Sequence, residues 1–128
     1  MRLLLDTHTF IWWFEASRQL PPRARQAVED EENDVLISAA SAWEIATKRR
    51  LGKLAGVDAL ATDLAGAIAS QDFEGLPITV DDAARAGALP GPHRDPFDRV
   101  LIAQALARDL ILVSNESLFD RYGVRRLW

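Results

Sequence analysis

The stretch DPFDRVLIAQALARDLILV, residues 95–113, joins an amphipathic helix directly to a short apolar strand. Asp95 followed by Pro96 is a typical helix start, because Asp caps the first turn and Pro fits the first helical position. The helix is expected over 95–109, and the apolar run Leu110–Val113 is typical of a strand that is buried on both faces. A helix that leads into a buried strand is the repeating unit of a parallel α/β sheet.

Outward from this stretch, strands and helices alternate along the whole chain. Further strands are expected at 3–5, 34–38, about 76–78 and within 124–128. Further helices are expected at about 10–14, 22–31, 38–51, 57–71 and 80–87. The alternation predicts one α/β domain over 1–128, with a mostly parallel central sheet and helices on both faces.

The composition excludes several kinds of protein. None of the 128 residues is Cys, which excludes disulfides, thiolate metal sites and cysteine nucleophiles. His8 and His93 are the only histidines and lie far apart, so a histidine-based zinc site is not expected. No apolar run reaches the roughly 18 residues of a membrane helix and no signal peptide is recognisable, which predicts a cytoplasmic protein. The formal net charge of −4 disfavours nucleic-acid binding by phosphate neutralisation alone.

Acidic and polar residues follow the two best-defined strands. Asp6 ends the run Leu3–Leu5, and Ser114, Asn115 and Glu116 follow Leu110–Val113. Ligand sites of parallel sheets lie at the carboxyl ends of the strands, so these residues are candidates for a site. The structural alternatives are that Asp6 caps the next helix and that Asn115 and Glu116 form a turn.

Two further acids are expected on helices. Glu44 fits a capping box with Ser41, but Ser38 is the better cap because it directly follows a strand, which leaves Glu44 inside the helix. An acid among large apolar residues needs a partner if it is buried. Asp98 falls in the first turn of the helix that Asp95 caps, where the helix dipole favours a carboxylate.

A parallel sheet would bring all these acids to one edge. Oxygen ligands without Cys or a His cluster select Mg²⁺ or Mn²⁺ over zinc, and a divalent cation offsets the repulsion among carboxylates. An alternative is a phosphatase that uses Asp6 as a covalent nucleophile. That chemistry usually wants a second acid two residues further on, where this chain has His8.

Four blocks of the sequence, in order and over nearly the whole chain, resemble the PIN-domain ribonucleases, and among them the VapC-type toxins of bacterial toxin–antitoxin pairs. The blocks are LLLDTHTFIWWF, ISAASAWEIATKRRLGKL, HRDPFDRVLIAQALARDLILVSNESLF and YGVRRLW. The family's acids fall on Asp6, Glu44, Asp98 and Glu116. The chain departs from the family at Glu116, where Asp is more frequent.

The resemblance implies a three-layer α/β/α sandwich and metal-dependent cleavage of RNA by an activated water. Asp6, Glu44 and Asp98 would hold one or two Mg²⁺ or Mn²⁺ ions, and Glu116 would ligate directly or through water. Other residues are candidates for orienting ligands or contacting RNA: Thr7, Ser114, Asn115, Asp95, Arg94 and Arg99. With four acids assigned to such a site, the rest of the chain is near neutral and has a basic patch at 48–53.

The resemblance also implies protein partners, namely a cognate antitoxin and a second copy in a homodimer. Trp12, Trp13 and Phe14 are consecutive, and at least one of them is a candidate for a partner surface because aromatic residues are enriched at interfaces. A PIN-like module that binds RNA or protein without catalysis is the main alternative, and the Glu116 departure is its best support.

Overall fold

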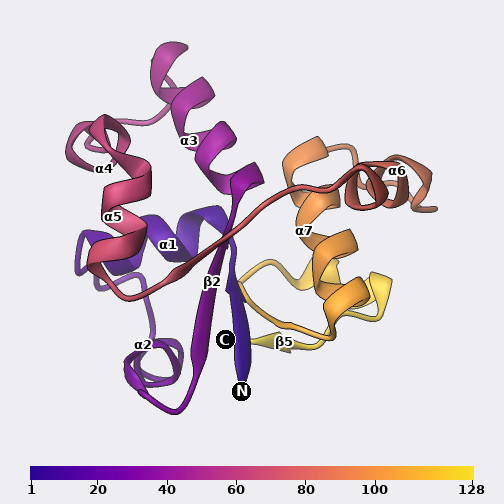
Figure 1. Ribbon diagram of the computed structural model, residues 1–128, viewed down its shortest axis with the longest axis horizontal. Helices are drawn as coiled ribbons and strands as arrows, with labels where there is room; N and C mark the ends of the chain where they lie inside the picture. The colour runs from indigo at the N-terminus through magenta and orange to yellow at the C-terminus, as the bar shows by residue number, and fades with distance from the viewer.

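The computed structural model describes residues 1–128 and contains one five-stranded sheet (Figure 1). Its strands are β1 Arg2–Leu5, β2 Asp34–Ser38, β3 Glu74–Leu76, β4 Ile111–Val113 and β5 Arg126–Leu127. The strand order is β3-β2-β1-β4-β5, and every pair is parallel. This confirms the α/β fold class and the parallel sheet.

Helices cover both faces of the sheet. They are α1 Thr7–Phe14, α2 Pro22–Glu29, α3 Ala39–Arg50, α4 Asp58–Thr62, α5 Leu64–Ser70, α6 Val80–Ala88 and α7 Pro96–Arg108, with a 3₁₀ helix η1 Ser117–Tyr122. In Figure 1, α1, α2, α4 and α5 lie on one side of the strands, and α6 and α7 lie on the other. The three-layer α/β/α arrangement is therefore confirmed.

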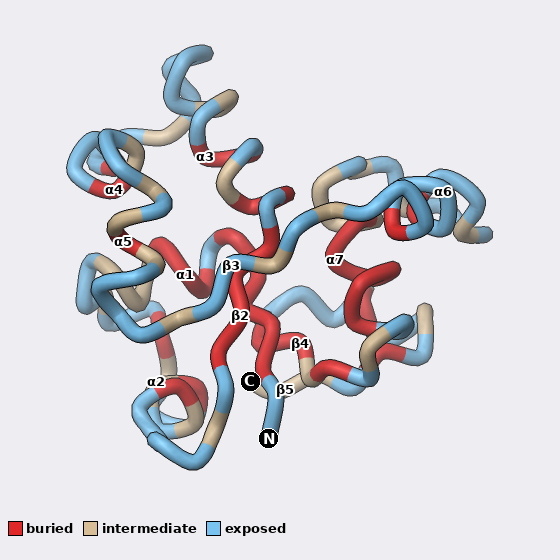
Figure 2. Tube along the Cα trace, in the orientation of Figure 1, coloured by how far each residue is buried: buried red, intermediate tan, exposed pale blue.

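Alternation along the central strands builds the two halves of the core. Leu3 and Leu5 of β1 belong to one hydrophobic cluster together with Phe10, whereas Leu4 belongs to a second cluster with Leu101. All three leucines are fully buried because successive side chains of a strand point to opposite faces. Figure 2 shows this buried centre, with exposed backbone mostly at the periphery.

The region between α3 and α6 differs from expectation in two places. The single helix expected over 57–71 is two helices, because Asp63 adopts φ −148°, ψ 81° and its side chain caps α5 by accepting from Gly66 N. The edge strand lies at 74–76 rather than 76–78. Pro77 follows this strand, which agrees with the inability of proline to donate to a ladder.

None of the helices combines the length and the hydropathy that a bilayer span requires.

The strand order places the carboxyl ends of β1 and β4 side by side at the centre of the sheet. The chain proceeds outward from β1 to β2 and β3 on one side, and from β4 to β5 on the other. Open α/β sheets bind ligands where the strand order reverses in this way. Asp6 follows β1 and Ser114 follows β4, so both lie at this position.

Candidate acidic site at the carboxyl edge of the sheet

A cavity of about 200 Å³ opens at the carboxyl edge of the sheet, and the four predicted acids line it together. Its lining residues are Asp6, Thr7, His8, Glu44, Lys48, Asp95, Asp98, Asn115, Glu116 and Phe119. They come from the ends of β1 and β4, from the start of α1, from α3, from the start of α7 and from η1. Residues up to 113 positions apart in the chain thus converge through the parallel topology.

Asp6 is both a helix cap and a member of the cavity wall. Its Oδ1 accepts from Thr9 N at 2.8 Å, which starts α1, and its backbone N–H donates to Val113 O at 3.2 Å. The side chain is almost completely buried. Burial raises the pKa of Asp6 above its usual value, although hydrogen bonds from Ser114 and Thr9 partly oppose this. The capping and the functional interpretations of Asp6 are therefore compatible.

Glu44 lies inside α3 and not in a capping box. Ser38 caps this helix, because its Oγ accepts from Ala40 N at 3.0 Å. The Glu44 side chain is 4% exposed and has partners for both of its oxygens. Thr7 Oγ1 donates to Oε1 at 2.6 Å, and Lys48 Nζ donates to Oε2. A buried carboxylate requires such partners, which explains why a charge is tolerated here.

Lys48 is the cation of the site. It stands one helical turn after Glu44, at a spacing that brings side chains together on one face. Partial burial lowers the pKa of Lys48, but the hydrogen bond and the charge of Glu44 outweigh this effect and raise it. Lys48 is therefore a fixed positive charge at the wall of an otherwise acidic cavity.

Asp95 and Asp98 divide two tasks at the start of α7. Asp95 Oδ1 accepts from Phe97 N at 2.9 Å and from Asp98 N at 3.2 Å, so it caps the helix. Asp98 instead receives a hydrogen bond from His93, with Nε2 and Oδ2 2.8 Å apart. Burial and the negative charge of Asp95 raise the pKa of Asp98 to about 6, although His93 acts against this. This is the carboxylate repulsion that a divalent cation would relieve.

The segment after β4 contributes one buried and two exposed residues. Ser114 is fully buried, and its Oγ accepts from Glu116 N at 3.0 Å. Asn115 and Glu116 are exposed at the mouth of the cavity. Glu116 is thus the most accessible of the four acids, and its carboxylate also lies 3.4 Å from Leu118 N at the start of η1.

The two arginines expected to contact RNA do not line the cavity. Arg94 is exposed in the loop before α7. Arg99 is engaged within the domain: its guanidinium donates to the backbone carbonyls of Ala86 and His93, at 2.9 and 2.8 Å, and to that of Leu89. With three backbone carbonyls as acceptors, the Arg99 guanidinium holds the loop between α6 and α7, and it does not line the cavity.

Three polar residues at the site were not singled out as site residues from the sequence. Lys48 could have been found from its spacing of four from Glu44. His8 lies two positions after Asp6, and a helix after a strand end brings it to the rim. His93 reaches Asp98 from an irregular loop, and no sequence periodicity predicts that contact.

The donor chemistry of the cavity suits a hard divalent cation. Carboxylate and amide oxygens gather in one small space without any thiolate, which is the ligand set of hard divalent cations. No three acidic or histidine side chains are already placed to share one ion, and Glu44 is paired with Lys48 and Asp98 with His93. Residues Asp6, Glu44 and Asp98 would hold the cation, with Glu116 and Asn115 beside them at the mouth.

Comparison with known proteins agrees with this architecture. A stretch of 30 residues is 63% identical to Ribonuclease VapC16 from Mycobacterium tuberculosis, and it spans only 23% of this chain and 21% of that protein. The fold resembles VapBC2 from Rickettsia felis bound to a DNA fragment from the promoter, with a TM-score of 0.72, 17% identity and coverage of 99% and 98% of the two chains.

A second similar structure is that of VapC20 from M. tuberculosis, described as a sarcin–ricin loop cleaving toxin. The TM-score is 0.65 at 17% identity, and 95% of each chain is covered. At such identities the structural likeness concerns the fold. The model of the PIN domain family matches residues 3–125, which is nearly the whole chain. With its parallel sheet and its acids at the carboxyl edge, this chain belongs to the PIN domain family.

Proposed function

We propose that this protein is an endoribonuclease that depends on Mg²⁺ or Mn²⁺ and serves as the toxin of a toxin–antitoxin pair. The observation that carries the proposal is the convergence of Asp6, Glu44, Asp98 and Glu116 in one cavity at the carboxyl edge. The family match and the local identity to a named ribonuclease support the choice of RNA as substrate.

The residues of the cavity divide the work of phosphodiester hydrolysis. A bound divalent cation would supply charge stabilisation at the phosphate and a more acidic water. Asp6, which follows β1, and Asp98, at the start of α7, provide negative charge. Thr7 fixes the orientation of Glu44 through its hydroxyl. Lys48 lines the same cavity, so its ammonium group could attract a phosphate oxygen if its pairing with Glu44 loosened.

We also propose two protein partners, an antitoxin and a second copy of the chain. The similar structures include toxin–antitoxin complexes, among them VapBC2 from R. felis, so we expect a small antitoxin that covers the acidic cavity. A homodimer is also expected. Trp12, Trp13 and Phe14 are half-buried against the first hydrophobic cluster, which leaves part of each ring for a partner.

The direct test is cleavage of a panel of structured RNAs by the purified chain with Mg²⁺, with Mn²⁺ and with EDTA. We expect cleavage with either ion and none with EDTA, and we expect Asp6→Asn to remove it. Asn is also a good helix cap, so the circular-dichroism melt of this variant should match that of the parent. Divalent-ion binding, measured by calorimetry, should weaken in the same variant.

Two outcomes would replace the proposal. If the parent chain binds no divalent ion and cleaves no RNA, the non-catalytic PIN-like module is the better description. If a phosphoryl group is trapped on Asp6 during turnover, the chain is a phosphatase. Products that carry a 5′-phosphate and a 3′-hydroxyl, with no covalent intermediate, would support hydrolysis by water.

A further inference from the structure

Two aromatic side chains stand apart from the hydrophobic core. Every other Phe, Trp and Tyr of the chain packs within or against one of the three hydrophobic clusters, whereas Trp43 on α3 and Phe97 on α7 belong to none. Trp43 is 58% exposed. Large aromatic rings dominate the burial energetics of cores and interfaces. A ring that the fold leaves in water is therefore available to a ligand.

Trp43 and Phe97 contact each other across the two helices. Their ring centroids are 4.9 Å apart and the planes make an angle of 82°, which is an edge-to-face pair. Such a pair is attractive beyond the area that it buries, so Phe97 fixes the orientation of the indole. In this geometry Phe97 can touch at most one face of the indole, and the exposure of Trp43 shows that the ring is open to solvent.

The pair lies beside the acidic cavity. Trp43 precedes Glu44 on α3, and Phe97 precedes Asp98 on α7. The rings contact each other across α3 and α7, and the acids that directly follow them on these two helices both line the cavity. Lys48 stands one turn further along α3 and faces the same cavity. A flat apolar surface, a cation and the proposed reaction centre are therefore neighbours.

We infer that the Trp43–Phe97 pair is a stacking platform for an unpaired nucleobase next to the phosphodiester that is cleaved. This inference rests on the proposed function and adds the residues that hold a base of the substrate beside the reaction centre. Bases inside an A-form duplex cannot reach such a ring, whereas unpaired bases stack on aromatic side chains. Stacking is tolerant of sequence, because every base offers a π face.

The surroundings of Trp43 favour a nucleobase over a second copy of the chain. A stable dimer buries about 800 Å² on each partner around a contiguous apolar centre. The other exposed large apolar side chains are Met1, Leu51, Val80 and Leu106. Of these, Leu51 ends α3 two turns beyond Trp43, and the others lie in other parts of the fold. An isolated ring of this size matches one base rather than a protein surface.

The test measures RNA binding in the Asp6→Asn background, where the RNA stays intact. The probes are fluorescein-labelled oligo(A), oligo(U) and an abasic ribose-phosphate oligomer of equal length, followed by anisotropy at fixed salt. We expect affinity to fall from oligo(A) to oligo(U) to the abasic oligomer. Trp43→Ala should weaken oligo(A) binding about 5- to 150-fold and leave the abasic oligomer unchanged, because one stacked base is lost.

Two control variants keep the result interpretable. Trp43→Phe should retain most of the affinity for oligo(A), and Leu106→Ala, at an exposed position on α7 far from the cavity, should retain all of it. The inference is overturned if Trp43→Ala binds oligo(A) like its parent, if it loses affinity for the abasic oligomer equally, or if no RNA binds. It is also overturned if light scattering shows that Trp43→Ala changes the number of associated chains.

These outcomes are separate from those that test the proposed function. Binding that depends on Trp43, in a chain that never cleaves RNA, would support the platform and contradict the nuclease. Cleavage that depends on Asp6 but not on Trp43 would support the nuclease and contradict the platform.

Discussion

Both ends of the sheet carry acidic cavities, and they differ in burial. The cavity at the carboxyl edge is about 200 Å³ and contains Asp6 and Glu44 as nearly buried carboxylates. The groove at the amino edge, between α2, the start of β2 and β3, is larger, at about 550 Å³. It is lined by six acids, all exposed: Glu29, Asp30, Glu31, Asp34, Asp72 and Glu74. We call it the amino-edge groove.

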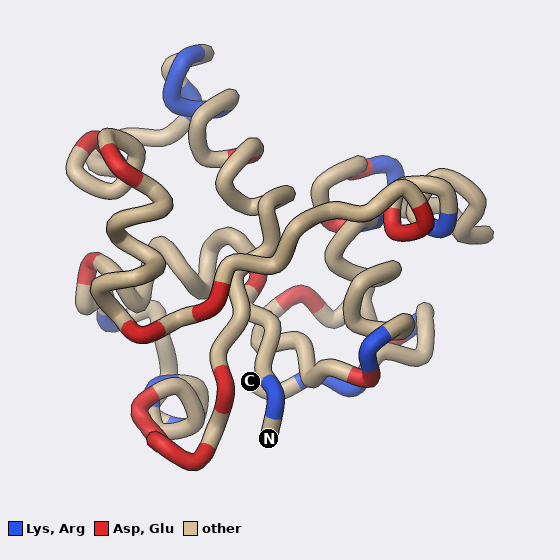
Figure 3. The backbone as a smooth tube through the Cα atoms, in the orientation of Figure 1, with Lys and Arg blue, Asp and Glu red and all other residues tan.

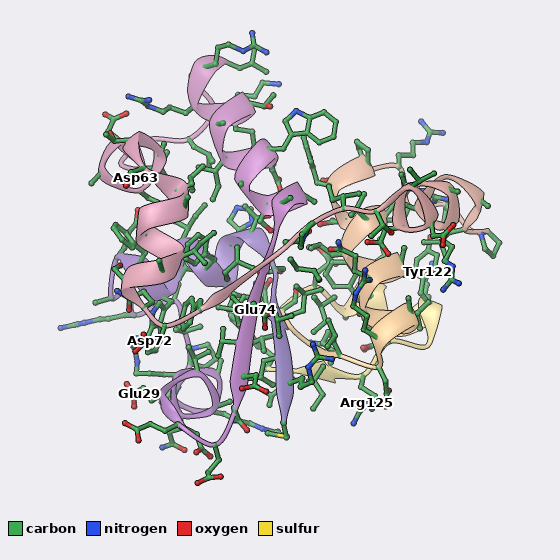
Figure 4. The ribbon with its side chains drawn as sticks, in the orientation of Figure 1. Glu29, Asp63, Asp72, Glu74, Tyr122 and Arg125 are labelled. Atoms are coloured by element: carbon green, nitrogen blue, oxygen red, sulfur yellow. The ribbon has the colours of Figure 1, made fainter.

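The figures make the contrast visible. Figure 3 shows a run of acidic residues around the turn between α2 and β2, and a basic end of α3 on the opposite side of the molecule. Figure 4 shows Glu29, Asp72 and Glu74 on the side of α2 and β2, and Glu29 reaches outward. Water solvates charges in the groove, whereas the carboxylates at the other edge depend on protein partners. Burial, and not the number of acids, distinguishes the candidate site.

The largest expected effect compares one acid from each cavity. Asp98→Asn should lower RNA cleavage more than about 100-fold, which exceeds what the loss of a supporting partner costs. Asp72→Asn, the matched change in the amino-edge groove, should leave cleavage unchanged. Single-turnover cleavage of the same RNA measures both. Equal losses in the two variants would contradict the assignment of the site to the carboxyl edge.

A smaller effect is expected from the residue that orients Glu44. Thr7→Val removes the hydroxyl that donates to Glu44 and keeps the side-chain shape, so cleavage and ion affinity should fall about 10- to 100-fold. Thr7→Ser keeps the donor and should retain most activity. Calorimetric titration with Mn²⁺ gives the affinity, and a loss as large in Thr7→Ser as in Thr7→Val would show that packing rather than the hydrogen bond matters.

An ion pair outside both cavities, between a buried Asp82 and a half-buried Arg108, concerns stability rather than activity. Arg108 binds Asp82 through two hydrogen bonds of 2.9 Å. Burial raises the pKa of Asp82, but the bonds from Arg108, Thr79 and Gln104 outweigh it and lower the pKa to about 2. Because the folded-state pKa lies below the unfolded one, this pair stabilises the fold above pH 4. That contribution, about 2 kcal/mol, is lost as the pH falls toward 2.

Urea unfolding between pH 7 and pH 2 measures this contribution. Asp82→Asn should be less stable than the parent at pH 7, and the difference should shrink as the pH falls. Asp120→Asn removes the exposed partner of Arg126 and should cost less, because solvent screens that pair. A difference between parent and Asp82→Asn that is independent of pH would contradict the assignment.

The smallest effect is expected from the amino-edge groove itself. Replacing Asp34 and Glu74 by Asn and Gln removes two exposed like charges, so the free energy of unfolding should change by no more than about 0.5 kcal/mol for each substitution. Chemical denaturation at low and at high salt measures the change. A large loss of stability would show that these acids have partners that the groove does not display.

Sequence patterns predicted the elements that have a clear apolar pattern. They missed the features that depend on single side-chain contacts. Leu3–Leu5 and Leu110–Val113 are apolar runs, so β1 and β4 and the acids after them could be placed. The edge strand at 74–76 was misplaced by two residues, because Glu74 and Gly75 are poor strand formers. The hydrogen bond between His93 and Asp98 depends on a loop conformation that no sequence pattern predicts.

Arg99 shows the converse: the sequence suggested a site residue that the structure places outside the cavity. Its position next to Asp98 suggested a contact with RNA. Consecutive helical residues point in different directions, however, and Arg99 faces the loop that follows α6. The roles of Asp6, Glu44, Asp98 and Glu116 remain predictions, and the structure adds that they share one cavity.

The clamp made by Arg99 has a consequence for motion. It holds carbonyls of Ala86, Leu89 and His93, and the Tyr122 hydroxyl accepts from His93 N at 3.3 Å. The loop that carries His93 is therefore bound to α7 through Arg99 and to η1 through Tyr122. The loop cannot open without breaking these bonds, so we expect its opening to be coupled to local unfolding at α7.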